Sequence, residues 1–219
     1  MRMLDSNLKK SLKSRRTIIF ISSLSLICFL FITFLKSSFA AVDANVNSWS
    51  ASIQSTSFTQ AAEVINYSFD MTALLAASIL IAAYLLYKNH KNDALLLAAA
   101  MLGNAVIITT VKLLVHSPRP LNGIITEQGL SFPSGHVMST MVLFGLLTYF
   151  AWRHRKSSRA KILSILLFAA VAFIVGLDRI YLNVHWFSDV LGAYSLGVFW
   201  LTFSILVFQH SGRIVKSKL

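Results

Sequence analysis

The amino-acid sequence predicts an all-α, polytopic membrane helix bundle with about six transmembrane helices and both termini in the cytoplasm. Of the 219 residues, 56% are hydrophobic and only 13% are charged, whereas an average soluble domain has roughly 25% charged residues. Apolar runs of about 18 residues or more recur along the chain. The formal net charge is +12, and most basic residues lie between these runs. We therefore attribute the charge to membrane topology and expect no nucleic-acid partner.

The first part of the chain predicts one membrane span followed by an outward-facing loop, together residues 17–70. Residues 1–16 are polar and basic and are expected in the cytoplasm, and residues 17–35 are long enough to span. Ser38-Phe39-Ala40 resembles a signal-peptidase site, but the run exceeds the usual h-region of about 7–15 residues. A retained anchor is favoured, and cleavage stays open. The polar stretch 41–69 predicts one or two short helices at the membrane interface.

The remaining chain predicts a membrane-embedded core, residues 71–208, and a cytoplasmic tail, residues 209–219. Pro and Gly punctuate a loop in this core, and Pro133-Ser134-Gly135-His136 looks like a helix start with Ser134 near the N-cap. Five apolar runs in the core are long enough to span. They are expected at 71–87, 94–115, 134–152, 162–177 and 185–208.

Basic residues are distributed unevenly between the two sides of the predicted bundle. Six precede the first span, two lie in 88–93, five in 153–161 and three in 213–218. These sixteen share one side if the spans alternate, and the positive-inside rule makes that side cytoplasmic. Lys36 flanks the first span and is expected to anchor it. Three cations are left at the outer boundary, where charges against the bias are functional candidates: Lys112, Arg119 and Arg179.

These three cations suit a phosphate group. Lysine supplies a point charge, and arginine a planar fork that binds two oxygens. The backbone N–H groups near Ser134 and Gly135 open a predicted helix, which is a ready anion site, and glycine allows close approach of the backbone. The three cations would also be suitable as interfacial anchors. The sequence favours phosphate binding chiefly because histidine and aspartate lie beside these cations.

Two histidines and an aspartate add chemistry beyond binding. His185 and Asp189 are four residues apart, so on a helix they share a face. The carboxylate would fix the imidazole tautomer and leave the other ring nitrogen free to attack phosphorus. His136 would then protonate the leaving oxygen. No CxxC or HExxH spacing occurs in the sequence, and we expect neither a metal nor another cofactor. A structural helix pair is the plainer alternative for His185 and Asp189.

Three separated signatures resemble the type-2 phosphatidic acid phosphatase superfamily. The first is Lys112, six residues, then Arg119-Pro120. The second is Pro133 to His136, and the third is Arg179, five residues, His185, three residues, Asp189. The resemblance covers roughly residues 71–208 and implies a metal-independent phosphatase. It implies His185 as nucleophile, Asp189 as its partner and His136 as acid. The residues that it implies for phosphate binding are Lys112, Arg119, Ser134, Gly135 and Arg179.

One position departs from the third signature. Asp178 stands where a serine usually precedes the arginine. A carboxylate cannot donate a hydrogen bond to phosphate unless it is protonated. We expect Asp178 either to orient Arg179 or to neutralise part of the cation cluster.

The resemblance implies an enzyme of the bacterial cytoplasmic membrane that acts on lipid phosphates at the outward face through a phosphohistidine. Undecaprenyl diphosphate and phosphatidylglycerophosphate are the favoured substrates, with phosphatidic acid and lipid A phosphates as alternatives. A non-catalytic phospholipid-binding or transport protein is a second class, and a vanadate-dependent haloperoxidase is disfavoured because the chain is mostly spans. Expected partners are the lipid substrate and membrane lipids, and the sequence does not fix the oligomeric state.

Overall fold

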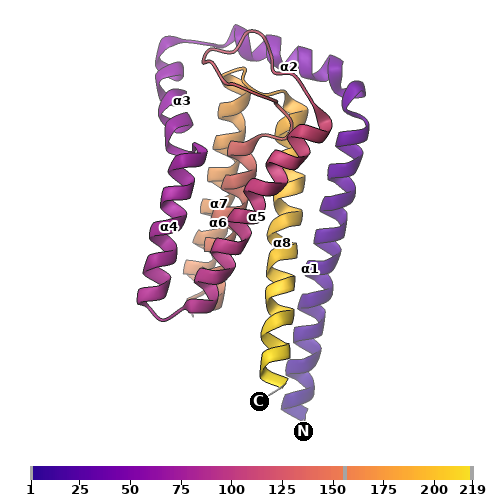
Figure 1. The fold of residues 1–219 in the computed structure, drawn as a ribbon, viewed down its shortest axis with the longest axis vertical. Helices are drawn as coiled ribbons and strands as arrows, with labels where there is room; N and C mark the ends of the chain where they lie inside the picture. Colours follow the sequence, from indigo (N-terminus) through magenta and orange to yellow (C-terminus); the bar gives the residue numbers. More distant parts are fainter. Residues whose placement is uncertain (1, 155–156, 218–219) are drawn as a thin grey trace.

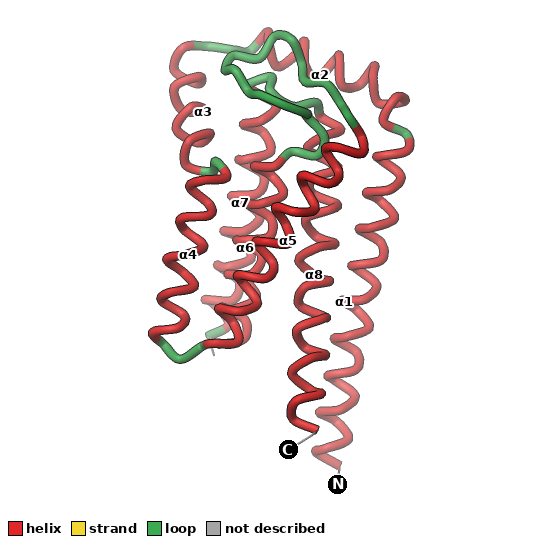
Figure 2. The backbone as a smooth tube through the Cα atoms, in the orientation of Figure 1, coloured by secondary structure: helices red, strands yellow, loops and turns green. Residues whose placement is uncertain are grey.

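A computed structural model describes residues 2–154 and 157–217, with the side chains of residues 15–154 and 157–210. Helices account for all the regular structure within these ranges, and no strand occurs there (Figures 1 and 2). The elements are α1 (Arg2–Phe34), the 3₁₀ helix η1 (Lys36–Phe39), α2 (Ala40–Ser52), α3 (Thr56–Ser68), α4 (Met71–Tyr87), α5 (Lys91–Val115), α6 (Gly135–His154), α7 (Ser158–Tyr181) and α8 (Phe187–Ser217).

The helices confirm the predicted membrane bundle. Among the described residues, α1, α5, α6, α7 and α8 are each long and apolar enough to cross a membrane. The pair α3 and α4 bends by 48° at a short break and brings the number to six if it is one span. Large apolar side chains such as Phe20, Leu80 and Leu166 are exposed on the outside of the bundle. Lipid can cover such a surface, whereas water cannot do so favourably.

The long connections gather at one end of the bundle, and both termini lie at the other (Figure 2). Helix α2 lies across the loop end, while α1 and α8 run side by side down one flank (Figure 1). The connection from α5 to α6 and the turn from α7 to α8 meet at this end, where Ile124 N donates a hydrogen bond to Leu182 O at 2.9 Å. The two sequence stretches with candidate residues, 112–136 and 179–189, therefore lie together.

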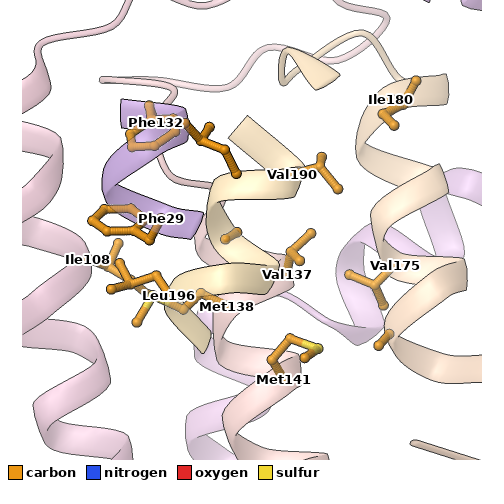
Figure 3. Packing of buried hydrophobic residues seen from close by; sticks show 13 residues of the cluster. Phe29, Ile108, Phe132, Val137, Met138, Met141, Val175, Ile180, Val190 and Leu196 are labelled. Carbon is orange, nitrogen blue, oxygen red and sulfur yellow. The ribbon is translucent and has the colours of Figure 1, made fainter. Parts of the chain in front are cut away.

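The packing below the loop end centres on Phe132. This ring is fully buried and stacks on Phe29 of α1, with 5.8 Å between the ring centroids (Figure 3). Helix α8 approaches it so closely at Gly192 that a Cβ there would lie 2.5 Å from a Phe132 ring carbon. Because the next residues open α6, this packing also fixes the position of Pro133 and Ser134.

The helices extend past the predicted apolar spans. Helix α5 begins at Lys91 rather than 94, and α7 covers Ser158–Tyr181 rather than 162–177. The predicted bounds of each span follow the apolar content of the sequence. In the structure, capping residues and backbone hydrogen bonds determine where each helix begins and ends. The side chain of Ser157, for example, caps α7 by accepting from Ala160 N. The two short helices predicted within 41–69 are α2 and α3, and α3 continues into α4.

The basic segments predicted at 1–16 and 209–219 fall mostly outside the residues whose side chains are described. Arg155 and Lys156 of the basic run 153–161 lie outside the described residues altogether. The assignment of these segments to the cytoplasm stays a prediction, as do the division into core and flanking segments and the orientation of the bundle.

The charge bias predicts that the loop end faces outward. Leu121 lies on a loop at that end, and Asn92 lies beside the α4–α5 turn at the opposite end; both are exposed. In a Cys28→Ser background, a membrane-impermeant maleimide added to intact spheroplasts should label Leu121→Cys. It should label Asn92→Cys only after the membrane is opened. The reverse labelling pattern would contradict the predicted orientation.

Candidate active site

The loop after α5 is fixed to the turn before α8 by hydrogen bonds. Helix α5 ends at Val115, and the C-cap residue His116 has a left-handed φ of 51°, which turns the chain sharply. Ser131 N donates to Ser117 O at 2.8 Å, which closes the loop on itself. Trp186 Nε1 donates to Pro118 O at 2.8 Å. These hydrogen bonds fix the position of the loop after α5 relative to the turn before α8. The two groups of candidate residues are therefore held next to each other.

His185 and Asp189 form a buried pair at the start of α8. The His185 ring is 3% exposed, and its Nδ1 lies 3.4 Å from Asp189 Oδ2. The same oxygen accepts from Trp186 N at 2.9 Å. The prediction that both residues share a helix was wrong in one respect, because α8 begins at Phe187. His185 lies in the preceding turn, and the backbone at Trp186 brings its ring to the carboxylate.

Arg119 holds the opposite edge of the His185 ring. Its Nη1 lies 3.2 Å from His185 Nε2 and donates to Val184 O at 2.9 Å. A guanidinium N–H always donates, so Nε2 is the acceptor. The ring proton then lies on Nδ1, directed to Asp189. This tautomer leaves the lone pair of Nε2 facing the arginine.

The surroundings keep the His185 imidazole neutral. Burial lowers the pKa of His185 from 6.5 to about 4. The hydrogen bond and charge of Asp189 oppose this shift in the pKa of His185, while the charges of Arg119 and Lys112 add to it. At pH 7 the ring is therefore a neutral imidazole rather than an imidazolium.

Glu127 bridges the two candidate phosphate-binding arginines. Its carboxylate oxygens lie 3.5 Å from Arg119 Nη2 and 3.4 Å from Arg179 Nη1. Arg179 is fully buried, and its Nε donates to Asp178 Oδ2 at 3.0 Å. Asp178 thus contacts Arg179, as it must if its role is to orient that arginine. An anion between two guanidinium groups occupies the place that a phosphate would take.

The start of α6 brings the second signature beside the His185–Asp189 pair. Ser134 N donates to Asp189 O at 3.3 Å, and Ser134 O accepts from Met138 N in the first turn of α6. The buried Ser134 Oγ has no hydrogen-bond partner among the described residues. His136 Nε2 lies 3.8 Å from Asp70 Oδ1, within ion-pair range. The Asp70 carboxylate caps α4, so α4 is also attached to the site.

The structure brings most of the predicted residues into direct connection. A hydrogen bond joins Arg119 to His185, another joins Ser134 to Asp189, and Glu127 links Arg119 to Arg179. Gly135 and His136 follow Ser134 at the start of α6. Lys112 is set further back, where its Nζ donates to Leu130 O at 2.7 Å. The geometry thus assembles cations, an anion-accepting helix start and an imidazole at one end of the bundle.

Lys36 is a site residue that the sequence reasoning placed wrongly. It was expected to anchor the first span, but its Nζ lies 2.7 Å from Asp189 Oδ1 and 2.9 Å from Ser188 Oγ. Asp43 of α2 accepts from Ser188 N at 2.8 Å and from Ser188 Oγ at 2.7 Å. The count of basic residues sets Lys36 apart from the sixteen that are predicted to be cytoplasmic. This count is the one sequence signal that could have identified Lys36 as a site residue.

Fold and site together define a polytopic helical membrane protein with a cluster of cations and a His–Asp pair at one end. The sequence model of the PAP2 superfamily matches residues 93–213. This match covers more than half of the chain, and the chain belongs to the PAP2 superfamily.

A protein sequence and a solved structure, both from Bacillus subtilis, are similar to this chain. Phosphatidylglycerophosphatase B of Bacillus subtilis (strain 168) is 30% identical over 127 residues, which are 57% of this chain and 63% of that relative's length. The crystal structure of a transmembrane PAP2 type phosphatidylglycerolphosphate phosphatase from Bacillus subtilis superposes with a TM-score of 0.76 at 24% identity. It covers 83% of this chain and 94% of the other. The structural likeness confirms the fold.

We predict that Glu127 competes with anions for the two arginines. Glu127→Gln keeps the shape but removes the charge, so inorganic phosphate should bind about 3–5-fold more tightly, the gain expected from an ion pair of roughly 1 kcal/mol or less. Isothermal titration of the purified protein with phosphate measures this. Glu63→Gln, in α3, is the matched control and should change nothing. Weaker phosphate binding in Glu127→Gln would show that the carboxylate supports the site instead.

We also predict that His185 stays neutral, with its proton on Nδ1, down to about pH 5, because burial lowers its pKa to about 4. Long-range ¹H–¹⁵N spectra of protein labelled at histidine report tautomer and charge, and His185→Gln assigns the signal. An imidazolium signal from His185 at pH 6 would contradict the geometry described above.

Proposed function

We propose that this protein hydrolyses the phosphate group of a membrane lipid through a phosphohistidine on His185, at the outer face of the bacterial cytoplasmic membrane. The observation that carries the proposal is the fixed orientation of His185. Asp189 lies at its Nδ1 and Arg119 at its Nε2. Binding alone needs cations, whereas an imidazole oriented by a carboxylate suits attack on an electrophile.

The proposed reaction begins when the substrate phosphate replaces the Glu127 carboxylate between Arg119 and Arg179. Lys112, Gly135 and the unpartnered hydroxyl of Ser134 complete the phosphate site. As Arg119 turns to the phosphate, it releases His185 Nε2. The cations then stabilise the negative charge on the equatorial oxygens of the transition state, which is the main electrostatic contribution to phosphoryl transfer.

In the first step, His185 Nε2 attacks phosphorus, and an N–P bond forms while the P–O bond to the leaving group breaks. The Nδ1 proton stays directed to Asp189, which stabilises the positive charge on the ring. The negative charge of the bound phosphate favours the imidazolium form of His136, which gives its proton to the leaving oxygen. The lipid departs as an alcohol, or as a lipid phosphate if the substrate is a diphosphate.

In the second step, water attacks the phosphohistidine. His136, now neutral, takes a proton from that water, and the P–N bond breaks. Inorganic phosphate leaves, and His185 regains its lone pair on Nε2. Every proton and charge in these two steps is handled by side chains of this chain, so the proposed reaction needs no metal ion.

Phosphatidylglycerophosphate is the first substrate to test, because the curated relative is named as its phosphatase. Undecaprenyl diphosphate is the second. A cavity of about 460 Å³ opens beside Arg119 and is lined by loop residues that include Glu127 and Asn183. That volume accommodates a polar headgroup while the lipid chains stay in the bilayer.

The test is release of inorganic phosphate by purified protein in detergent, with both lipids and phosphatidic acid as substrates. We expect turnover that persists in excess EDTA, stops with orthovanadate and is lost in His185→Ala. His210→Ala, at an exposed histidine at the other end of the bundle, is the control and should keep activity. Lipid binding without phosphate release by the wild type would favour a binding or transport protein.

We predict that the importance of His136 depends on the leaving group. General acid catalysis is worth roughly 10²–10⁴-fold for a poor leaving group such as a lipid alkoxide. A nitrophenolate barely needs the proton, and a phosphate leaving group falls between. His136→Ala should therefore lower kcat/KM strongly for the lipid monoester, less for the diphosphate and little for p-nitrophenyl phosphate. Equal losses on all three would leave His136 as a phosphate contact without an acid role.

A further inference from the structure

A cluster of His90, Asp93 and His154 lies at the end of the bundle opposite the candidate active site. His90 precedes α5, Asp93 lies in its first turn, and His154 ends α6. One potential ligand atom from each lies within 4.8 Å of the others. His154 Nε2 lies 2.5 Å from Asp93 Oδ2, and the two imidazole centroids are 4.4 Å apart. No local spacing predicts this cluster, because His154 ends α6, whereas His90 and Asp93 lie at the start of α5.

Asp93 is held as ligating carboxylates are held. The Asp93 side chain is buried, and its polar partners among the described residues are Arg153 and His154. Arg153 Nη1 donates to Oδ1 at 2.9 Å, which leaves Oδ2 directed to His154. A carboxylate that ligates a metal through one oxygen usually has the other oxygen hydrogen-bonded. Arg153 therefore orients Asp93 without occupying the oxygen that faces the histidines.

We propose that His90, Asp93 and His154 bind a Zn²⁺ ion, with water as the fourth ligand. Two imidazoles and one carboxylate are a zinc donor set, whereas Ca²⁺ and Mg²⁺ require mostly oxygen ligands. Tetrahedral ligands at about 2.0–2.1 Å from zinc lie roughly 3.3 Å apart. The contact between His154 and Asp93 must therefore open by about 0.8 Å on binding. The His154 side chain is 35% exposed, so it has room to rotate.

The proposed ion lies too far from His185 to take part in the proposed phosphatase reaction. Helix α6 runs from Gly135 at the active-site end to His154, so about 30 Å separates the two sites. A bound ion would join the α4–α5 turn to the ends of α5 and α6. An ion that binds the folded protein and not the unfolded chain raises stability with concentration.

The experiment is a zinc titration of the full-length protein after treatment with EDTA. We expect one Zn²⁺ per chain by elemental analysis and a Tm rise of about 5–10 °C at zinc concentrations near 100 times Kd. His90→Gln changes an exposed residue and leaves the Asp93 contacts with Arg153 and His154 intact. It should keep the zinc-free Tm but lose the zinc-dependent rise. His210→Gln, at an exposed histidine outside the cluster, should behave like the wild type.

Two results would overturn the zinc site. A wild-type Tm that does not change with zinc would leave the cluster as a hydrogen-bonded ion pair. A zinc-dependent rise that persists in His90→Gln would place the ion elsewhere. Either result is independent of phosphate release, since the assay reads stability and metal content.

A second inference concerns Lys36 and rests on the proposed function. The Asp189 carboxylate is fully buried, and its two oxygens have different partners. Oδ2 faces His185 and Trp186 N, whereas Oδ1 accepts from Lys36 Nζ at 2.7 Å. The ammonium also lies 4.9 Å from the centroid of the Phe132 ring, which adds a cation–π contact. Lys36 belongs to η1 and lies before the region that the PAP2 superfamily model matches, residues 93–213.

We infer that Lys36 is a positioning residue that holds the Asp189 carboxylate in the plane needed by His185. Without the ammonium, one oxygen of a buried carboxylate loses its charged donor. The carboxylate would then rotate toward other donors and release the imidazole. Because Lys36 acts through Asp189, its loss should affect kcat and leave substrate binding nearly unchanged.

The test compares Lys36→Met, Lys36→Arg and the exposed control Lys88→Met. Loss of a hydrogen bond to a charged group should lower kcat about 10–100-fold in Lys36→Met and leave KM unchanged. Lys36→Arg keeps a charged donor and should restore most of the kcat. The His185 Nδ1–H resonance should shift in Lys36→Met and not in Lys88→Met. This resonance is read without turnover, so it tests Lys36 even if the proposed function fails. Unchanged kcat and an unchanged resonance would overturn the inference.

Discussion

The candidate site depends on how the buried carboxylate of Asp189 is compensated. A buried charge is costly unless it is paired and hydrogen-bonded. Here the donors come from two parts of the chain: the Lys36 ammonium in η1, and the Trp186 backbone N–H and the His185 ring in the turn before α8. Asp189 O also accepts from Ser134 N at the start of α6. Asp189 thus connects η1, the second and third signatures and α8 through its carboxylate and its backbone carbonyl.

The same arrangement prepares the site for an anion. Backbone carbonyls hold Arg119 and Asp178 holds Arg179, so in the proposed reaction Arg119 is the arginine that must turn when a phosphate arrives. Glu127 balances their charge until then. Low exposure strengthens these interactions relative to water, and it keeps His185 neutral. The burial that makes the Asp189 charge costly therefore also favours the neutral imidazole that the proposed attack by His185 needs.

Much of the bundle and of the phosphate site could be predicted because both leave local signals in the sequence. The length of an apolar run predicts a membrane helix. The spacing of the three signatures predicted that Arg119, Ser134 and His185 would lie together. Contacts between distant residues without a characteristic spacing could not be predicted. Lys36 reaches Asp189 across 153 positions, and Glu127 reaches Arg179 across 52. The start of α8 was also missed, since apolar content does not reveal that His185 lies in a turn.

The central claim is that His185 Nε2 becomes covalently bonded to phosphorus. The most direct measurement is rapid acid-free quenching of turnover with ³²P-labelled lipid phosphate, followed by alkaline digestion and mapping of the labelled peptide. Phosphohistidine is stable in alkali, whereas phosphoserine is not. The account predicts label on the peptide that contains His185, and none in His185→Ala. Label on another residue, or label that persists in His185→Ala, would contradict it.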